Sequence, residues 1–227
     1  MKIRLGCLKM AIVAGVLAGG TSLAAFAADG DSFLQGTYLR LGAGLSFPES
    51  SGTQEATPFG SVPASVDFDT GYNITGAFGY EWASGLRLEG ELGYRHADLA
   101  HIDGVATTTG SSHVGSAMVN ALYDFHIGTA LTPYVGGGIG AGHEEWNNVY
   151  GNPGVIPGAH MGSTDFQWQL IGGLSFPLSN RVSLFTEYRY ITLDDPSFRN
   201  FGDGNLIGSY GDHSHNVLAG LRFNLGG

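Results

Sequence analysis

Hydrophobic and polar residues alternate one by one along most of the chain, and this period of two predicts β-strands. The pattern is clearest over 86–96, where one face is apolar and the other carries the row Arg87, Glu89, Glu91 and Arg95. After the N-terminal region we find no convincing helical period. We count eight strand segments, at 38–47, 71–82, 86–96, 115–125, 133–142, 165–176, 182–191 and 215–225.

The connections between these segments are alternately short and long. The short ones are 83–85, 126–132 and 177–181. The long ones, rich in Gly, Ser, Asp, Asn and Pro, are 48–70, 97–114, 143–164 and 192–214. This rhythm, with strands of about ten residues, is typical of barrels in the bacterial outer membrane. We therefore predict an all-β fold, an eight-stranded antiparallel up-and-down transmembrane β-barrel with periplasmic termini and extracellular long loops.

Aromatic residues on the apolar face favour this membrane barrel over a soluble, lipocalin-like barrel with an apolar interior. They gather at both ends of the strands, as in a barrel anchored at two membrane interfaces. A soluble core has no reason to sort its aromatic residues to both rims. The predicted girdles are Tyr72, Tyr94, Phe166, Trp168, Tyr188 and Tyr190 at the long-loop end, and Tyr80, Trp82, Tyr123, Phe125, Phe176 and Phe223 at the short-turn end.

The charged face of the strands then lines a lumen that is barely wide enough for side chains. Charges withdrawn from water must pair, so we expect a network of salt bridges and hydrogen bonds that plugs the lumen. The alternative is a gated, narrow, porin-like channel for small solutes. Glycines at 136, 138 and 140 leave space on one wall, which we expect arginine side chains to fill. The predicted lumen network is Arg40, Glu81, Arg87, Glu89, Glu91, Arg95, Asp124, Glu187, Arg189 and Arg222.

The first residues have the features of a secretory signal peptide: a basic start, an apolar run at 10–19 and a small-residue site ending at Ala27. We predict a signal peptide at 1–27 and a barrel domain at 28–227. The only cysteine, Cys7, lies in the signal. After cleavage the chain would carry seven arginines and no lysine against twenty acids. Nucleic acid is therefore excluded as a partner, because its binding needs a basic surface.

Histidines 143, 160, 213 and 215 fall in or beside the long loops near acidic residues, where they could contribute metal ligands. Such loop clusters are usually solvated, so we expect no specific metal site and no cofactor.

Some eight-stranded barrels hydrolyse lipid A, which requires a nucleophile and a base within hydrogen-bond reach. Ser214 is flanked by His213 and His215, but neighbours in a strand point to opposite faces. We therefore expect no enzymatic activity, and a lipid A-modifying hydrolase is the alternative.

Three segments resemble a known family: 131–140, the run from Glu187 to Tyr190, and the last strand at 215–225. They are similar to the small OmpA-like and opacity-like surface barrels of Gram-negative bacteria, a group that includes the alphaproteobacterial 25- and 31-kDa outer-membrane antigens. The resemblance implies insertion by the barrel-assembly machinery, which reads the C-terminal strand. Here Leu225 stands where that signal has an aromatic residue.

We expect a structural or surface-interaction role through the four long loops, in contact with outer-membrane lipids including lipopolysaccharide. The sequence does not identify an extracellular ligand.

Overall fold

The computed structural model describes residues 34–49, 51–57, 60–102, 108–151, 159–194, 197–199, 206–209 and 212–226. The predicted signal peptide at 1–27 lies outside these ranges, so it stays a prediction. Among the described residues, no helix is long and apolar enough to cross a membrane. The strands are β1 (Thr37–Pro48), β2 (Ser51–Thr57), β3 (Gly60–Phe68), β4 (Gly71–Glu81), β5 (Leu86–Ile102), β6 (Thr108–Asp124), β7 (Thr132–Gly151), β8 (Ala159–Pro177), β9 (Val182–Leu193), β10 (Ser197–Arg199), β11 (Leu206–Ser209) and β12 (Asp212–Asn224).

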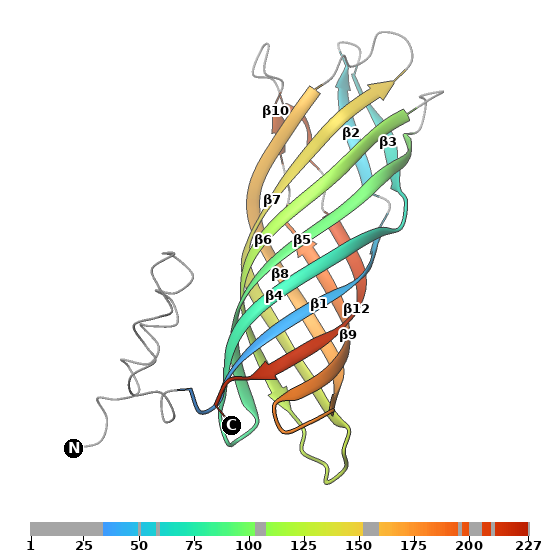
Figure 1. The fold of residues 1–227 in the computed structure, drawn as a ribbon. Coiled ribbons are helices and arrows are strands. Elements are labelled where there is room, and N and C mark those ends of the chain that lie inside the picture. Colours follow the sequence, from blue (N-terminus) through green and yellow to red (C-terminus); the bar gives the residue numbers. More distant parts are fainter. Residues whose placement is uncertain are drawn as a thin grey trace, which may run out of the picture.

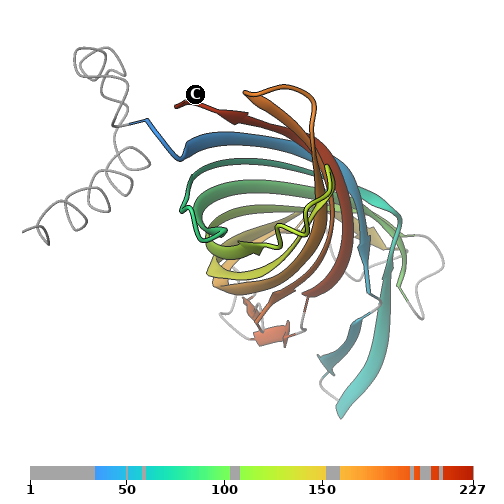
Figure 2. The same cartoon turned by 90° about the horizontal axis from the view of Figure 1, so that it is seen from below.

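Eight of these strands pair into a closed antiparallel barrel. Figures 1 and 2 show this barrel from the side and from below. Following the wall, the order is β1, β4, β5, β6, β7, β8, β9 and β12. The wall closes where β1 pairs with β12, with Leu41 opposite Leu221. A bridge between Gln35 and Gly226 holds both ends of the described chain at the short-turn end. The predicted eight-stranded up-and-down barrel is therefore confirmed.

The alternation in the sequence becomes an alternation between lumen and exterior. On β1, Arg40 points inward with 2% of its surface exposed, whereas the next residue, Leu41, points outward and is 60% exposed. The exposed apolar side chains include leucine, isoleucine, valine and phenylalanine from all around the wall. This is the reverse of a soluble barrel, and it places lipid around the outside. The soluble alternative is thus excluded.

The barrel wall is taller than the sequence analysis predicted. β5 to β8 continue well into the segments 97–114 and 143–164, which we expected to be loops. In the first connection, β2 and β3 form a hairpin whose second strand pairs with the upper part of β5, with Val66 opposite Ile102. β10 and β11 form a small separate sheet within the last long connection. Backbone pairing with a neighbouring strand does not require apolar side chains, so polar, turn-like sequences continue the ladder here.

Two of the short turns have glycine at a position where the backbone is left-handed. Gly85 has φ of 87° between β4 and β5, and Gly128 has φ of 77° between β6 and β7. A Cβ atom at Gly85 would lie 2.6 Å from the carbonyl oxygen of Asp124, so glycine is also required by space. These turns fix the order of strands at one end and thereby align the charged rows inside.

Candidate functional site: the ionic lumen

The centre of the lumen holds a cluster of four buried charges from three strands, β1, β5 and β9. Arg40 of β1 reaches Glu187 of β9 at 2.6 Å and Glu91 of β5 at 2.9 Å. Arg189 binds both oxygens of Glu91, at 2.6 and 2.7 Å, in a bidentate pair. Its Nε lies 2.6 Å from Glu187. Each carboxylate of this central cluster therefore serves two guanidinium groups, and the charges compensate one another.

A second cluster lies toward the short turns. Arg87 pairs with Asp124 at 2.9 Å, and Asp124 in turn lies 3.4 Å from Arg222. Arg222 also reaches Glu81 at 3.3 Å, close to the short-turn rim. Glu89 connects this group to the centre, because it lies 3.4 Å from Arg87 and 3.2 Å from Arg40.

Two inward-pointing tyrosines complete these clusters. Tyr38 donates a hydrogen bond of 2.7 Å to Glu89, and Tyr134 donates one of 2.9 Å to Glu187. The guanidinium of Arg87 lies over the Tyr134 ring, 4.7 Å from its centroid. The rings thus fill the width of the lumen while their hydroxyl groups satisfy carboxylate oxygens.

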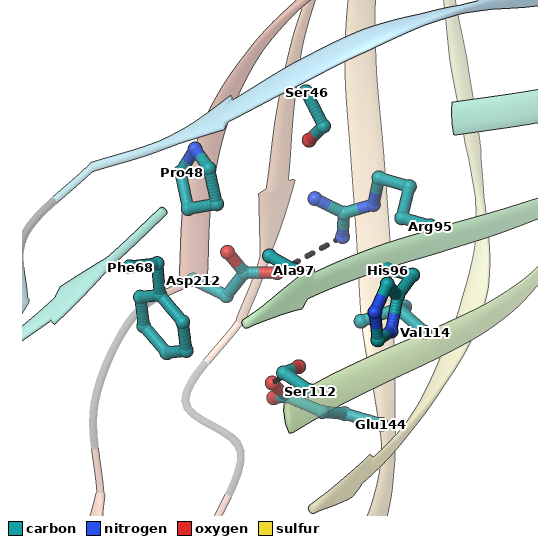
Figure 3. A pocket seen from close by; sticks show the side chains of 10 residues that line it. All are labelled: Ser46, Pro48, Phe68, Arg95, His96, Ala97, Ser112, Val114, Glu144 and Asp212. Atoms are coloured by element: carbon teal, nitrogen blue, oxygen red, sulfur yellow. Dashed lines mark hydrogen bonds and ion pairs between the residues drawn. The ribbon is translucent and has the colours of Figure 1, made fainter. Parts of the chain in front are cut away.

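A third group lies toward the long loops, where Arg95 pairs with Asp212 at 2.9 Å and also donates to Ser214. Asn216 donates a hydrogen bond to Ser214 and accepts one of 3.2 Å from Asn73 of β4, which reaches it past the intervening strand β1. Figure 3 shows the cavity beside Arg95, lined by Asp212, Ser46 and Glu144 among others. Its volume of about 20 Å³ is enough for one water molecule.

All ten residues of the predicted lumen network lie inside the barrel and take part in ion pairs. Asp212 was not among the predicted network residues, because the sequence pattern places it in a loop, and the hydrogen bond from Tyr38 was not predicted either. The pattern also placed Glu144 on a solvated loop, whereas Glu144 is buried and accepts a hydrogen bond of 2.7 Å from Ser112. The alternation simply continues two residues beyond the strand end that we predicted, and that was the available signal.

One prediction about the wall was wrong. Glycines 136, 138 and 140 of β7 do leave space, but the side chains nearest to them come from the neighbouring strand β6 and not from arginines. Leu122 lies beside Gly136, Asn120 beside Gly138, and Met118 beside Gly140. Side chains on adjacent strands lie side by side in register. The space beside each glycine is therefore occupied by the side chain of the neighbouring strand and not by a long side chain from across the lumen.

The predicted girdle residues all lie on the outer side of the wall, opposite to the inward rows. At the short-turn end Tyr80 contacts Trp82 with ring centroids 4.8 Å apart, and Tyr123 contacts Phe125 at 5.0 Å. At the long-loop end Trp168 and Tyr190 lie 5.7 Å apart.

The histidines that we had assigned to loops lie mostly on strands. His143 of β7 and both His213 and His215 of β12 are on the outer side, whereas Ser214 between them is buried in the lumen. The side chain of His160 is outside the described part of the chain. Among the described residues, no group of three His, Cys, Asp or Glu side chains is arranged to hold a metal ion.

A closed barrel with an apolar exterior, aromatic residues at both ends and ion pairs inside is a transmembrane β-barrel. The sequence profile of the family described as outer membrane protein beta-barrel domain matches residues 13–223. The chain belongs to this family. A protein of Gluconacetobacter diazotrophicus named outer membrane protein is 28% identical and aligns with 95% of this chain. The chain spans 63% of that relative's length.

Solved structures with a similar fold are also small outer-membrane barrels. Neisserial surface protein A superimposes with a TM-score of 0.52 at 17% identity, covering 83% of this chain and 97% of that one. OprG of Pseudomonas aeruginosa gives a TM-score of 0.54 at 16% identity, covering 83% and 95%. Together with the family match and the relative named outer membrane protein, this fold confirms the predicted resemblance to small OmpA-like barrels, and the family match and that relative support the outer-membrane location.

Proposed function

We propose that the protein is a non-enzymatic surface barrel that is closed to solutes and acts through its membrane exterior and its long-loop end. The central cluster carries this proposal. Arg40, Glu91, Glu187 and Arg189 meet across the middle of the lumen, and none of them is more than 3% exposed. A lumen wide enough only for side chains is filled when those side chains are paired arginines and glutamates.

The hollows at the two ends of the barrel do not join through this cluster in the proposed closed state. At the long-loop end, the cavity of about 20 Å³ ends at Arg95. At the short-turn end, a wider hollow of about 240 Å³ lies between Glu81, Trp82 and Asn180. Arg222 pairs with both Glu81 and Asp124, and Asp124 also pairs with Arg87, so in this proposal these ion pairs close the lumen between the hollow and the centre.

The proposal that the protein has no enzymatic activity rests on the positions of the expected nucleophile and base. Ser214 is directed into the lumen toward Arg95, while its histidine neighbours are on the opposite side of β12. A serine and a histidine separated by the wall cannot exchange a proton directly. Mass spectrometry of lipid A from a deletion strain tests this point. Unchanged acylation is expected, and acyl chains retained only in the deletion strain would contradict it.

Single-channel recording in planar bilayers tests the closed lumen. We expect no stable openings from the wild-type barrel. The double variant Glu91→Ala/Arg189→Ala removes one charge of each sign from the central cluster and should produce stable openings, provided that a folded-state gel shift shows an intact barrel. Openings of the wild type at neutral pH would contradict the proposal and favour the narrow channel.

We further propose that the long-loop end faces outward and the short turns face the periplasm, with β12 read by the assembly machinery. Cysteine variants test this orientation, since a membrane-impermeant maleimide labels only exposed thiols on the cell surface. Asp98→Cys at the long-loop end should be labelled in intact cells, whereas Ser84→Cys in a short turn should react only after lysis. Labelling of Ser84→Cys in intact cells would reverse the orientation.

A further inference from the structure

On four strands, the outward row of side chains reaches a histidine just beyond its apolar part, toward the long-loop end. On β5 the row runs through Leu92 and Tyr94 to His96; on β6, β7 and β12 the small or apolar row gives way to His113, His143 and His215. These four residues form what we call the histidine rim. It lies just beyond the apolar surface, at the long-loop end, where membrane proteins meet lipid headgroups.

The histidine rim is joined to the tyrosines of the upper girdle. The Tyr94 hydroxyl lies 2.7 Å from Nδ1 of His113, and the rings of Tyr72 and His96 lie 5.1 Å apart. His96 and His113 are directly opposite in the β5–β6 register, with ring centroids 4.6 Å apart. On the other side of the barrel, Tyr188 hydrogen-bonds His215, and the ring of His213 stacks on Tyr190.

Each part of the rim also contains a carboxylate. His215 lies 2.6 Å from Glu49, His143 lies 3.3 Å from Glu145, and His96 lies 3.4 Å from Asp98. Glu145 is in addition the cross-strand partner of His113. With neutral imidazoles the rim is therefore anionic, and protonation of the imidazoles removes or reverses that charge. Imidazole is the side chain whose charge ordinarily changes between about pH 5 and 8.

Among the residues whose side chains the structure describes, only the rim histidines and His213 can supply positive charge at this level of the outer surface. Arg40, Arg87, Arg95, Arg189 and Arg222 point into the lumen, and Arg181 belongs to a short turn at the opposite end. Of the side chains that the structure describes on the surface beyond the apolar belt, the imidazoles are thus the ones that can attract an anion.

We propose that the histidine rim binds the phosphate groups of lipid headgroups, and that this contact strengthens as the pH falls and the imidazoles become charged. The apolar belt directly beneath the rim holds acyl chains, so a lipid in the first shell brings its phosphate to the level of the rim. Charge complementarity selects an anionic headgroup at acidic pH, whereas the carboxylates Glu49, Asp98 and Glu145 repel it at neutral pH. The inference concerns the membrane surface and does not depend on the lumen being closed.

Electron spin resonance of spin-labelled lipids measures this contact directly. The barrel is reconstituted in phosphatidylcholine bilayers with EDTA present, and the association of spin-labelled phosphatidylglycerol is compared with that of spin-labelled phosphatidylcholine. Phosphatidylglycerol is chosen because its phosphodiester keeps one negative charge throughout the range. Its relative association should rise about threefold from about pH 8 to about pH 5.5, the size expected for a screened surface ion pair.

The five-residue variant His96→Gln/His113→Gln/His143→Gln/His213→Gln/His215→Gln, which also removes the imidazole stacked on Tyr190, should lose this rise and keep its association with phosphatidylcholine. The matched control His126→Gln lies in the short turn after β6, at the other end of the barrel, and should behave as wild type. If the five-residue variant does not fold, His143→Gln alone should reduce the rise, because half of the His143 side chain is exposed. A pH-independent wild type, or a rise that persists in the folded rim variants, would overturn the proposal.

Discussion

Arg40 and Glu187 are separated by 147 positions in the chain, yet Nη1 of Arg40 lies 2.6 Å from Oε2 of Glu187 in the centre of the barrel. Their strands do not pair, because β12 stands between β1 and β9 in the wall. The contact is therefore made across the lumen and not along the sheet. Both side chains are almost fully withdrawn from water, so each depends on the other for compensation of its charge.

Replacing one member of this pair should destabilise the barrel strongly. Glu187→Gln keeps the shape of the side chain but leaves Arg40 and Arg189 without one of their shared carboxylates. Removing one partner of a buried ion pair costs about 3 kcal/mol or more. Equilibrium unfolding in urea, in lipid vesicles, measures the loss.

The control for this experiment is Glu145→Gln, which changes the same chemistry at an exposed position beside His143. Exposed ion pairs contribute less than about 1 kcal/mol, so this variant should unfold close to wild type. Equal losses for the two variants would mean that the lumen charges are not effectively buried.

Arg87 and Asp124 allow the energetic coupling between two buried, paired side chains to be measured. Their side chains meet at 2.9 Å on neighbouring strands, and both are buried. Arg87→Met and Asp124→Leu should each destabilise the barrel, and the double variant should lose at least about 1 kcal/mol less than the sum of the two. Unfolding free energies of all four proteins give the coupling. Arg87→Met combined with the exposed Asp98→Asn should be additive.

A charged residue introduced on the outer surface should destabilise the barrel only where that surface lies within the membrane. Leu170 in the middle of β8 and Leu178 in the following turn are both 56% exposed, so they differ in surroundings and not in accessibility. Leu170→Arg should cost about 2–4 kcal/mol in a bilayer, because it places a guanidinium in the hydrocarbon layer. Leu178→Arg should change the free energy of unfolding little. Similar tolerance of both would argue against lipid at Leu170.

The glycines of β7 can be tested one at a time. A Cβ atom at Gly138 would run into the Asn120 side chain and lie 3.1 Å from the carbonyl oxygen of Val119. Gly138→Ala should therefore destabilise by about 1–3 kcal/mol. At Gly172 of β8 a Cβ atom meets nothing within 4 Å, so Gly172→Ala is the matched control and should be neutral or slightly stabilising. Thermal unfolding monitored by gel shift separates the two.

The period of two was sufficient to predict which side of the wall each strand residue occupies, since that depends only on the pleat. It could not predict which charges meet. Arg95 pairs with Asp212 of β12 and Tyr38 with Glu89 of β5 because the strands are tilted and staggered around the barrel. That stagger arises from the closure of all eight strands, so the sequence of a single strand does not predict it.

Strand ends were the weakest part of the sequence analysis. Glu144 was placed on a loop because His143, Glu144 and Glu145 contain no apolar residue. In the structure their alternation continues, with Glu144 inside and its neighbours outside. Beyond the lipid-facing part of the wall the outward residues need not be apolar. The alternation of apolar and polar residues therefore ends before the strand does.

The position of Arg40 on the first strand of the barrel bears on how the chain enters the membrane. Its carboxylate partners come from the third strand around the wall and from the seventh, so its charge is compensated only when early and late parts of the chain are together. Insertion of one hairpin at a time would expose an unpaired guanidinium to hydrocarbon. We therefore expect the chain to curl into a nearly complete cylinder before its interior leaves water.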